Sequence, residues 1–233
     1  ITWHHLANQT SCYGVSEAPG AAYCYNDWQM SLFWDLLFLK VYRTTYERVD
    51  EEVLHPLLTD LLGCEDNPTL MAFGTGDRAG RLGISPRDFA RFGLLYLHRG
   101  NWSGRQLLGE KLAQRAVTSP LPADLPQSSG KAAEMLPGQR TMGSRNVPDN
   151  QTDHFGSYSW LWWTNGIDRQ GTRHWPDAPV DLFGCFGHGG PRVMAVMPGL
   201  DLIVSWNDAG VKSREAENEA FRRLVAAVVD GTD

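Results

Sequence analysis

Two short stretches of the chain, far apart in sequence, carry side chains that can exchange protons. In Gly187-His188-Gly189-Gly190, three glycines surround a histidine just before two β-rich segments, residues 193–197 and 200–206. Glycine in such a place lets another backbone or a ligand approach closely, so this stretch predicts the wall of a cleft. The second stretch is Tyr25-Asn26-Asp27, at a corner between a loop and a helix. Side chains at such corners commonly point into clefts, so we expect Tyr25 and His188 to face one another.

Each of these residues also has a purely structural interpretation. Tyr25 then is a buried tyrosine beside a helix cap, and His188 satisfies a carbonyl group at the end of a strand. Trp160, Trp162 and Trp163 are interpreted as core aromatic residues rather than as a platform for sugars.

The elements that position the two stretches follow from local patterns. Asn26 or Asp27 can cap a helix over residues 28–41, whose leucines form one apolar stripe. A second helix is expected from Thr44 or Thr45 to Gly63, with Pro56 breaking or kinking it. Ser85-Pro86 is a strong start for a third helix, residues 110–117 form a short fourth, and Ser213 caps the closing one.

Helices come first, strands next, and a single helix last, which favours an α+β fold with a helical region beside an antiparallel sheet. We expect three parts: a mainly helical region over residues 1–118, a long loop or linker over 119–155, and strands with a C-terminal helix over 156–233. The loop is rich in Pro, Ser and Gly, has no periodicity, and is expected to border the site.

Composition excludes several classes of function. The 233 residues are 42% hydrophobic, which is typical of a globular protein, and the net charge of −6 gives no basic surface for nucleic acid. The most apolar run, residues 32–39, is too short for a membrane span. The chain opens with Ile1 and shows no signal-peptide pattern, so we expect it to begin partway through a gene product.

The four cysteines, Cys12, Cys24, Cys64 and Cys185, do not have the spacing of a zinc site. An even number permits two disulfides without requiring them, and at least two of the four are expected to be buried thiols. We expect no metal and no cofactor.

The order of several short motifs resembles the superfamily of serine β-lactamases, penicillin-binding proteins and esterases, in the branch closest to class C enzymes. The resemblance spans nearly the whole chain. The matching stretches are residues 1–6, Pro19-Gly20, Tyr25-Asn26-Asp27, residues 80–85 and 88–93, residues 100–104, and His188-Gly189-Gly190 before paired strands.

The resemblance implies a β-lactamase-like fold and an acyl-enzyme mechanism. In this family three motifs converge: a Ser-x-x-Lys, a Tyr-x-Asn, and a Lys or His followed by Thr, Ser or Gly and then Gly. They do so because a serine hydroxyl needs a base to take its proton. A phenol can be that base only where nearby cations lower its pKa from about 10. Tyr25 would then be the general base and acid, His188 would orient the substrate, and the strand after Gly189 and Gly190 would help to stabilise the oxyanion.

The chain departs from the family pattern in three places. No lysine precedes Tyr25, so the expected Ser-x-x-Lys is absent, and the one match in the chain, Ser128-Ser129-Gly130-Lys131, lies in the long loop. Asp27 replaces the family's Asn, and its carboxylate accepts hydrogen bonds but donates none. Pro191 has no N–H at the position that usually serves the oxyanion, so either Gly190 or Arg192 donates or the oxyanion hole is impaired.

These observations lead to a first hypothesis of a secreted or periplasmic serine hydrolase for an ester, amide or lactam, esterase-like more than strictly a β-lactamase. Without the nucleophile, this chain is expected to be inactive alone. The alternatives are a non-catalytic protein whose cleft binds cell-wall or glycan ligands, and a chain that works only with a separate N-terminal fragment. An incomplete sheet would expose a strand edge, so a dimer or a complementing fragment is a further expectation.

Overall fold

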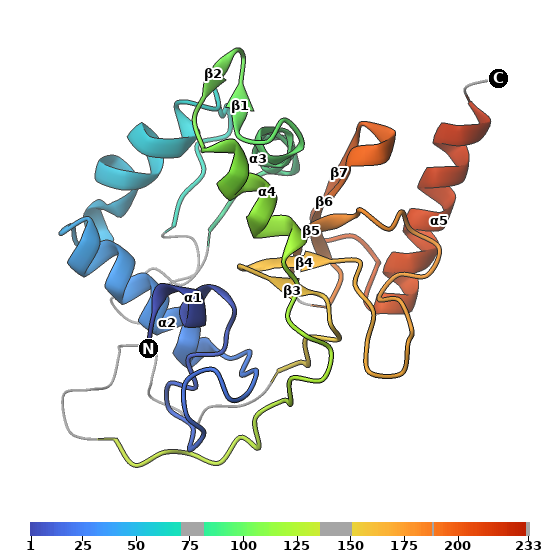
Figure 1. Cartoon of the computed structure of the whole chain (residues 1–233). Coiled ribbons are helices and arrows are strands. Elements are labelled where there is room, and N and C mark those ends of the chain that lie inside the picture. Colours follow the sequence, from blue (N-terminus) through green and yellow to red (C-terminus); the bar gives the residue numbers. More distant parts are fainter. Residues whose placement is uncertain (71–81, 136–150, 188, 232–233) are drawn as a thin grey trace. The chain divides into compact units, whose positions relative to one another are not determined.

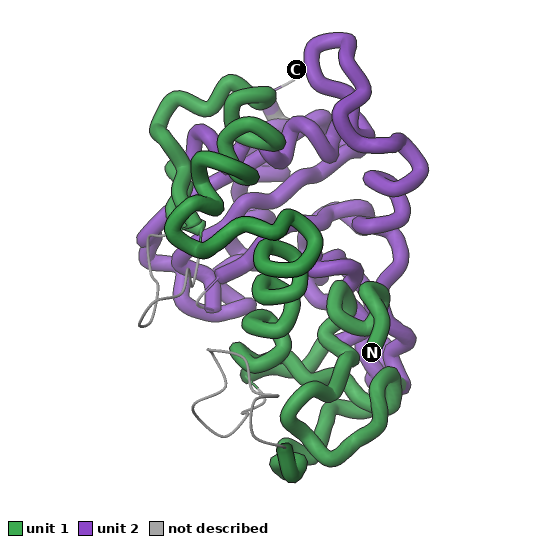
Figure 2. The backbone as a smooth tube through the Cα atoms, turned by 90° about the vertical axis from the view of Figure 1, so that its left-hand side faces the viewer, with its two compact units in different colours: residues 1–85, 125–154 green, residues 86–124, 155–233 purple. Residues whose placement is uncertain are grey.

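The computed structural model describes residues 1–70, 82–135, 151–187 and 189–231. Contacts between residues divide the chain into two compact units, each built from two separate stretches (Figure 2). Unit 1 comprises residues 1–85 and 125–154, and unit 2 comprises residues 86–124 and 155–233. Each unit has hydrophobic clusters of its own.

Unit 1 is helical. Its helices are α1 (Trp3–Ala7), α2 (Asp27–Trp34), the π-helix η1 (Asp35–Val41), the 3₁₀ turn η2 (Tyr46–Arg48) and the π-helix η3 (Asp50–Thr59). Because α2 runs directly into η1, the predicted helix over residues 28–41 is confirmed. Phe38 from η1 and Val53 and Leu54 from η3 are buried in one cluster with Tyr46 and Val49.

Pro56 lies inside η3, where the sequence predicted a break or a kink. The helix continues through it because the turns here are wide: the N–H of Asp60 donates to the carbonyl oxygen of His55 at 3.0 Å, five residues back. With bonds that reach five residues back, the N–H that Pro56 lacks would have bonded to the carbonyl oxygen of Glu51. Glu51 is exposed, so water can bond to this oxygen instead.

The described part of the long loop is ordered against the first residues of unit 1. Gln127 pairs with Tyr23 in a parallel bridge, and Ala132 pairs with Val15 in an antiparallel one. The N–H of Ser128 donates to the carbonyl oxygen of Tyr23 at 2.8 Å. Residues predicted as loop from their composition therefore support the segment that precedes Tyr25.

Unit 2 is built around a five-stranded antiparallel sheet in the order β3-β4-β5-β6-β7. The strands are β3 (Tyr158–Ser159), β4 (Trp162–Thr164), β5 (Phe183–Gly187), β6 (Arg192–Met197) and β7 (Leu202–Trp206), with the 3₁₀ turn η4 (Pro198–Leu200) between the last two. The helices are α3 (Pro86–Leu97), α4 (Glu110–Thr118) and α5 (Arg214–Asp230), and a small hairpin joins β1 (Asn101–Trp102) to β2 (Arg105–Gln106).

Helices cover both faces of this sheet (Figure 1). Alternation along the strands directs Met194 and Val196 of β6 toward α3 and α4, in one cluster with Trp162 and Phe183. On the opposite face, Phe221 of α5 packs edge-on against Phe186 at 6.1 Å. The predicted α+β fold is confirmed. Among the residues that the structure describes, the sheet is open, with β3 and β7 at its two edges. Within the described residues, no helix has the length and apolar character needed to cross a membrane.

Candidate functional site

Tyr25 lies immediately before α2, as the sequence predicted. Its ring is half-buried and stacks on the ring of Tyr23, with centroids 6.2 Å apart and an interplanar angle of 28°. Tyr23 is fully buried and meets His154 edge-on at 5.2 Å. The carbonyl oxygen of Tyr25 accepts a hydrogen bond of 3.0 Å from the N–H of Gln151, so the long loop borders this residue.

Asn26 and Asp27 form the beginning of the helix. The side-chain oxygen of Asn26 accepts the N–H of Gln29 at 3.1 Å, which makes Asn26 the N-cap. The amide nitrogen of Asn26 is buried, with no hydrogen-bond partner among the described residues. Asp27 is exposed at the first position of α2, where the helix dipole stabilises a negative charge.

Gln29 holds the segment before Tyr25 in place, and sequence reasoning did not single it out. Its side chain is fully buried, and its oxygen accepts the N–H of Ser11 at 2.9 Å and also the hydroxyl of Ser11. Its amide nitrogen donates to the carbonyl oxygens of Gln9, at 3.3 Å, and Cys24. The only available signal was a glutamine in the first turn of a helix, which is too common to indicate this role.

The Ser-x-x-Lys match at residues 128–131 does not lie on a helix. It belongs to the loop that pairs with Tyr23 and Val15. The hydroxyl of Ser128 donates to the carboxylate of Glu17 at 3.1 Å, and the hydroxyl of Ser129 donates to the same carboxylate at 2.8 Å. Desolvation raises the pKa of Glu17, but hydrogen bonds, among them those from Ser129 and Ser128, together outweigh it and leave this pKa below its ordinary value. This arrangement fastens a loop through a carboxylate and does not resemble a nucleophile beside a lysine.

Gly189 and Gly190 form the turn between β5 and β6 in unit 2, and His188 lies outside the described residues. Both glycines have positive φ, 69° and 118°, which explains why the turn needs residues without a Cβ atom. The N–H of Gly190 donates to the carbonyl oxygen of Gly187 at 3.3 Å. The sequence offered the N–H groups of Gly190 and Arg192 as donors to an oxyanion. The N–H of Gly190 is already used to close the turn.

A buried glutamate, Glu217, lies close to this turn. Glu217 of α5 accepts a hydrogen bond of 2.9 Å from Nε1 of Trp175, and a Cβ atom at Gly190 would lie 3.2 Å from its other carboxylate oxygen. Burial raises the pKa of Glu217, and the bond from Trp175 partly offsets this. Trp206 donates from Nε1 to the carbonyl oxygen of Gly190 at 2.8 Å. The indole of Trp206 thus holds the turn by a hydrogen bond, and the carboxyl group of Glu217 fills the space beside Gly190.

Next to Trp175, His174 is buried among aromatic rings. It stacks on Trp163 at 5.5 Å and meets Trp175 edge-on at 4.3 Å. Burial lowers the pKa of His174 to about 3, and the positive charge of Arg214 adds to the effect. Its Nδ1 has no hydrogen-bond partner among the described residues. Trp162 and Trp163 are also buried, which confirms their interpretation as core residues.

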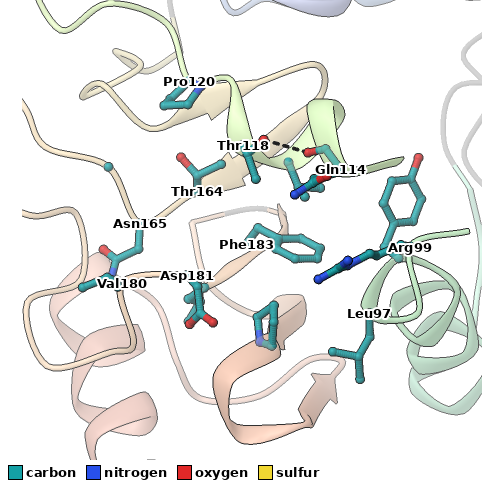
Figure 3. Close-up of a pocket in the computed structure, with 15 residues that line it drawn as sticks. Leu97, Arg99, Gln114, Thr118, Pro120, Thr164, Asn165, Val180, Asp181 and Phe183 are labelled. Carbon is teal, nitrogen blue, oxygen red and sulfur yellow. Dashed lines mark hydrogen bonds between the residues drawn. The ribbon is translucent and has the colours of Figure 1, made fainter. Parts of the chain in front are cut away.

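Unit 2 also contains a cavity of about 390 Å³, shown in Figure 3. Its lining includes Phe183, the first residue of β5, and Figure 3 shows Phe183 between Asp181 on one side and Arg99 on the other. The hydroxyl of Thr164, a buried lining residue, has no hydrogen-bond partner within the described part of the chain. Gly189 and Gly190 follow the other end of β5, so the turn that they form does not line this cavity.

The residues of the predicted site fall in both units of the chain. Tyr25 and Asp27 come together at the N-terminus of α2 in unit 1. Gly189 and Gly190 lie in a turn that unit 2 holds firmly. The pairing of Tyr25 with His188 stays a prediction, since His188 is not among the described residues.

Comparison with solved structures decides the fold. The chain is similar to a protein classed as a β-lactamase from Bacteroides dorei, with a TM-score of 0.61 and 14% identity over 99% of this chain and 72% of that one. It is also similar to a β-lactamase from Mycobacterium bovis, with a TM-score of 0.56 and 17% identity over 97% of this chain and 73% of that one. The chain has a β-lactamase-like fold.

A third structure with this β-lactamase-like fold is classed as a 6-aminohexanoate-dimer hydrolase, from Bacillus anthracis. The TM-score is 0.53 and the identity 17%, over 93% of this chain and 46% of that one. No protein-family model matches the sequence, and neither does any curated protein. At these identities the likeness establishes how the chain is folded, and its chemistry has to be argued from its own residues.

Proposed function

We propose that this sequence belongs to a serine hydrolase that acts through an acyl-enzyme on an ester, an amide or a β-lactam. The observation that carries the proposal is the β-lactamase-like fold with Tyr25-Asn26-Asp27 at the start of α2. The hydrolase names of the similar structures support the reaction class, because each of them denotes cleavage of an amide or a lactam bond.

In this proposal Tyr25 takes the proton from a serine hydroxyl and returns it to the leaving group. Its half-buried ring, held by Tyr23 and by the backbone bond from Gln151, is oriented by rigid neighbours. The exposed carboxylate of Asp27 pairs with the lysine that keeps the phenol acidic. His188 orients the substrate, and Gly189 and Gly190 let the substrate approach the backbone.

The substrate class follows from Asp27. An amide at this position can donate a hydrogen bond to the acylamino group of a β-lactam, whereas a carboxylate only accepts hydrogen bonds. We therefore propose esterase-like activity in preference to strict β-lactamase activity. We also propose a periplasmic or secreted location.

The serine nucleophile is proposed to lie outside these 233 residues, which makes this chain inactive by itself. Ser128, the serine of the only Ser-x-x-Lys in the sequence, is buried and engaged with Glu17. A complementing polypeptide or a second copy of the chain would then pair with the open sheet, whose edge strands are β3 and β7.

A serine-directed fluorophosphonate probe tests this proposal. The probe is applied to the longest polypeptide that the gene encodes and, separately, to residues 1–233, with heat-denatured samples as controls. Stoichiometric labelling of one serine outside residues 1–233, with none in the shorter chain, is the expected result. Labelling of a serine within residues 1–233 would overturn the inactivity of this chain, and an unlabelled long polypeptide would overturn the hydrolase proposal.

A further inference from the structure

Two cysteines lie in contact beneath the residue that precedes Tyr25. The Sγ atoms of Cys12 and Cys24 are 3.5 Å apart, and the two side chains are 4% and 0% exposed. They share a small buried cluster with Val15 and Ala22. Both thiols also point toward the carbonyl oxygen of Ala22, at 3.5 Å from Cys12 and 3.9 Å from Cys24.

The backbone holds both cysteines firmly in this position. The N–H of Cys24 donates to the carbonyl oxygen of Gln9 at 2.8 Å, and the carbonyl oxygen of Cys24 accepts the buried amide of Gln29. Cys12 has a positive φ of 51°, a conformation that most residues other than glycine, asparagine and aspartate avoid.

The other two cysteines have different surroundings. Cys64 follows η3 elsewhere in unit 1, and Cys185 lies on β5 of unit 2, against the cluster that α3 covers. Burial raises the pKa of the Cys185 thiol to about 12, so it is a poor nucleophile near neutral pH.

The contact between Cys12 and Cys24 shifts the pKa values of the two thiols in opposite directions. A hydrogen bond from Cys24 lowers the pKa of Cys12 more than desolvation raises it. The same contact, together with burial, raises the pKa of Cys24. One thiol of the pair would attack a disulfide oxidant as its thiolate, and the other would complete the exchange.

We propose that Cys12 and Cys24 are a site of reversible disulfide formation, which fastens the segment leading into Tyr25. The oxidant is a small-molecule or protein disulfide, for which oxidised glutathione serves as the probe. The thiolate of one cysteine attacks one of its sulfurs, breaks the S–S bond and releases one glutathione thiolate. The thiolate of the other cysteine then attacks the Sγ atom that carries the remaining glutathione and releases it as the second thiolate. Two protons and two electrons leave the cysteines, and the oxidant becomes two thiols.

The crosslink would close a short loop that contains the Pro19-Gly20 turn and ends one residue before Tyr25. Constraining this loop reduces the freedom of the unfolded chain and also the freedom of Tyr25 in the folded one. The inference rests on the contact between two sulfur atoms and does not require the proposed hydrolase activity.

The test uses the whole chain in glutathione buffers that range from fully reduced to fully oxidised. Because both thiols are buried, each sample is unfolded and refolded in its buffer before it is alkylated and analysed by mass spectrometry. In the oxidising samples we expect two alkylated cysteines and a peptide that links Cys12 to Cys24. Each such chain should weigh about 2 Da less than a chain that carries the same two alkyl groups and two free thiols. Four alkylated cysteines in every buffer would overturn the proposal, and so would a link that involves Cys64 or Cys185.

Matched variants separate the pair from the other cysteines. The double variant Cys64→Ser/Cys185→Ser keeps the pair and should still form the crosslink. In the wild-type chain the oxidised form should unfold at a higher urea concentration than the reduced form. Cys12→Ser should remove this difference, and equal midpoints for the two wild-type forms would contradict the claim that the crosslink constrains the loop.

Discussion

The amide nitrogen of Gln29 donates a hydrogen bond to the carbonyl oxygen of Cys24, the residue immediately before Tyr25. The oxygen of the same side chain accepts the N–H of Ser11 at 2.9 Å, so one buried amide joins the start of α2 to the loop that precedes it. In the proposed function, this fixed backbone on both sides of Tyr25 would keep the phenol within reach of the proton that it takes.

Replacing this amide with an apolar group of similar size should destabilise unit 1. In Gln29→Leu, the N–H of Ser11 and the carbonyl oxygen of Cys24 lose a partner in a buried place, which costs about 2–4 kcal/mol. Urea unfolding measures the difference. Gln114→Leu, at an exposed position on α4, is the matched control and should leave the midpoint almost unchanged. Equal effects of the two substitutions would mean that Gln29 has no special structural role.

Glu217 should make the protein less stable as the pH rises. Burial raises its pKa in the folded state, so its contribution to stability is complete below the pKa of the unfolded chain and is lost as the pH passes through the higher folded value. Glu217→Gln retains an acceptor for Trp175 and carries no charge. The stability of this variant relative to wild type should therefore increase from pH 4 to pH 7 in urea unfolding.

Glu219→Gln, on the same helix, is a control whose stability relative to wild type should change with pH in the opposite direction. Hydrogen bonds from Arg222 and Arg223 lower the pKa of Glu219 to about 2, so its contribution is lost as the pH falls. The stability of this variant relative to wild type should decrease from pH 4 to pH 7. The account of Glu217 fails if both variants change in the same direction.

His174 should make the folded protein sensitive to acid. Its pKa falls from about 6.5 in the unfolded chain to about 3 in the folded one, because burial disfavours the charged ring. Its contribution is complete above pH 6.5 and is lost as the pH falls toward 3, by roughly 3–5 kcal/mol in total. His174→Phe can keep the ring contacts with Trp163 and Trp175 without a titrating group. Unfolding measured from pH 7 to pH 4 should change less in this variant, and an unchanged profile would contradict the assignment.

Gly184 of β5 should not tolerate a side chain. A Cβ atom there would lie 2.4 Å from the carbonyl oxygen of Met194, on the paired strand β6. The backbone of a central strand has little room to move, so Gly184→Ala should cost about 3 kcal/mol in urea unfolding. On the same strand, a Cβ atom at Gly187 would meet its nearest neighbour at an ordinary 3.6 Å, which makes Gly187→Ala the control. A destabilisation at Gly187 as large as that at Gly184 would disprove this steric explanation.

Local rules predicted the parts of the fold that depend on neighbouring residues. Asn26 and Ser213 cap α2 and α5 as expected, and α3 begins at Pro86. The paired strands β6 and β7 on either side of Pro198-Gly199 were also predicted from their β-rich composition. In each case the signal and the structure lie within a few residues of each other.

What the sequence did not reveal depends on contacts between distant positions. The partners of Gln29 lie on an earlier loop, and the contact between Cys12 and Cys24 appears only when that loop folds back. Glu217 reaches the Gly190 turn from a helix that follows two further strands. Residues 125–132 were predicted as loop, yet they pair with Val15 and Tyr23 because of packing that composition does not encode.

The role of Tyr25 is tested most directly by Tyr25→Phe in the longest polypeptide that the gene encodes, assayed with a chromogenic ester and a chromogenic cephalosporin. Loss of the general base should lower kcat/KM by about 10²–10⁴. Tyr42→Phe, at an exposed position of unit 1, should retain full activity. If Tyr25→Phe hydrolyses the ester as fast as Tyr42→Phe does, Tyr25 is not the base and the account is wrong.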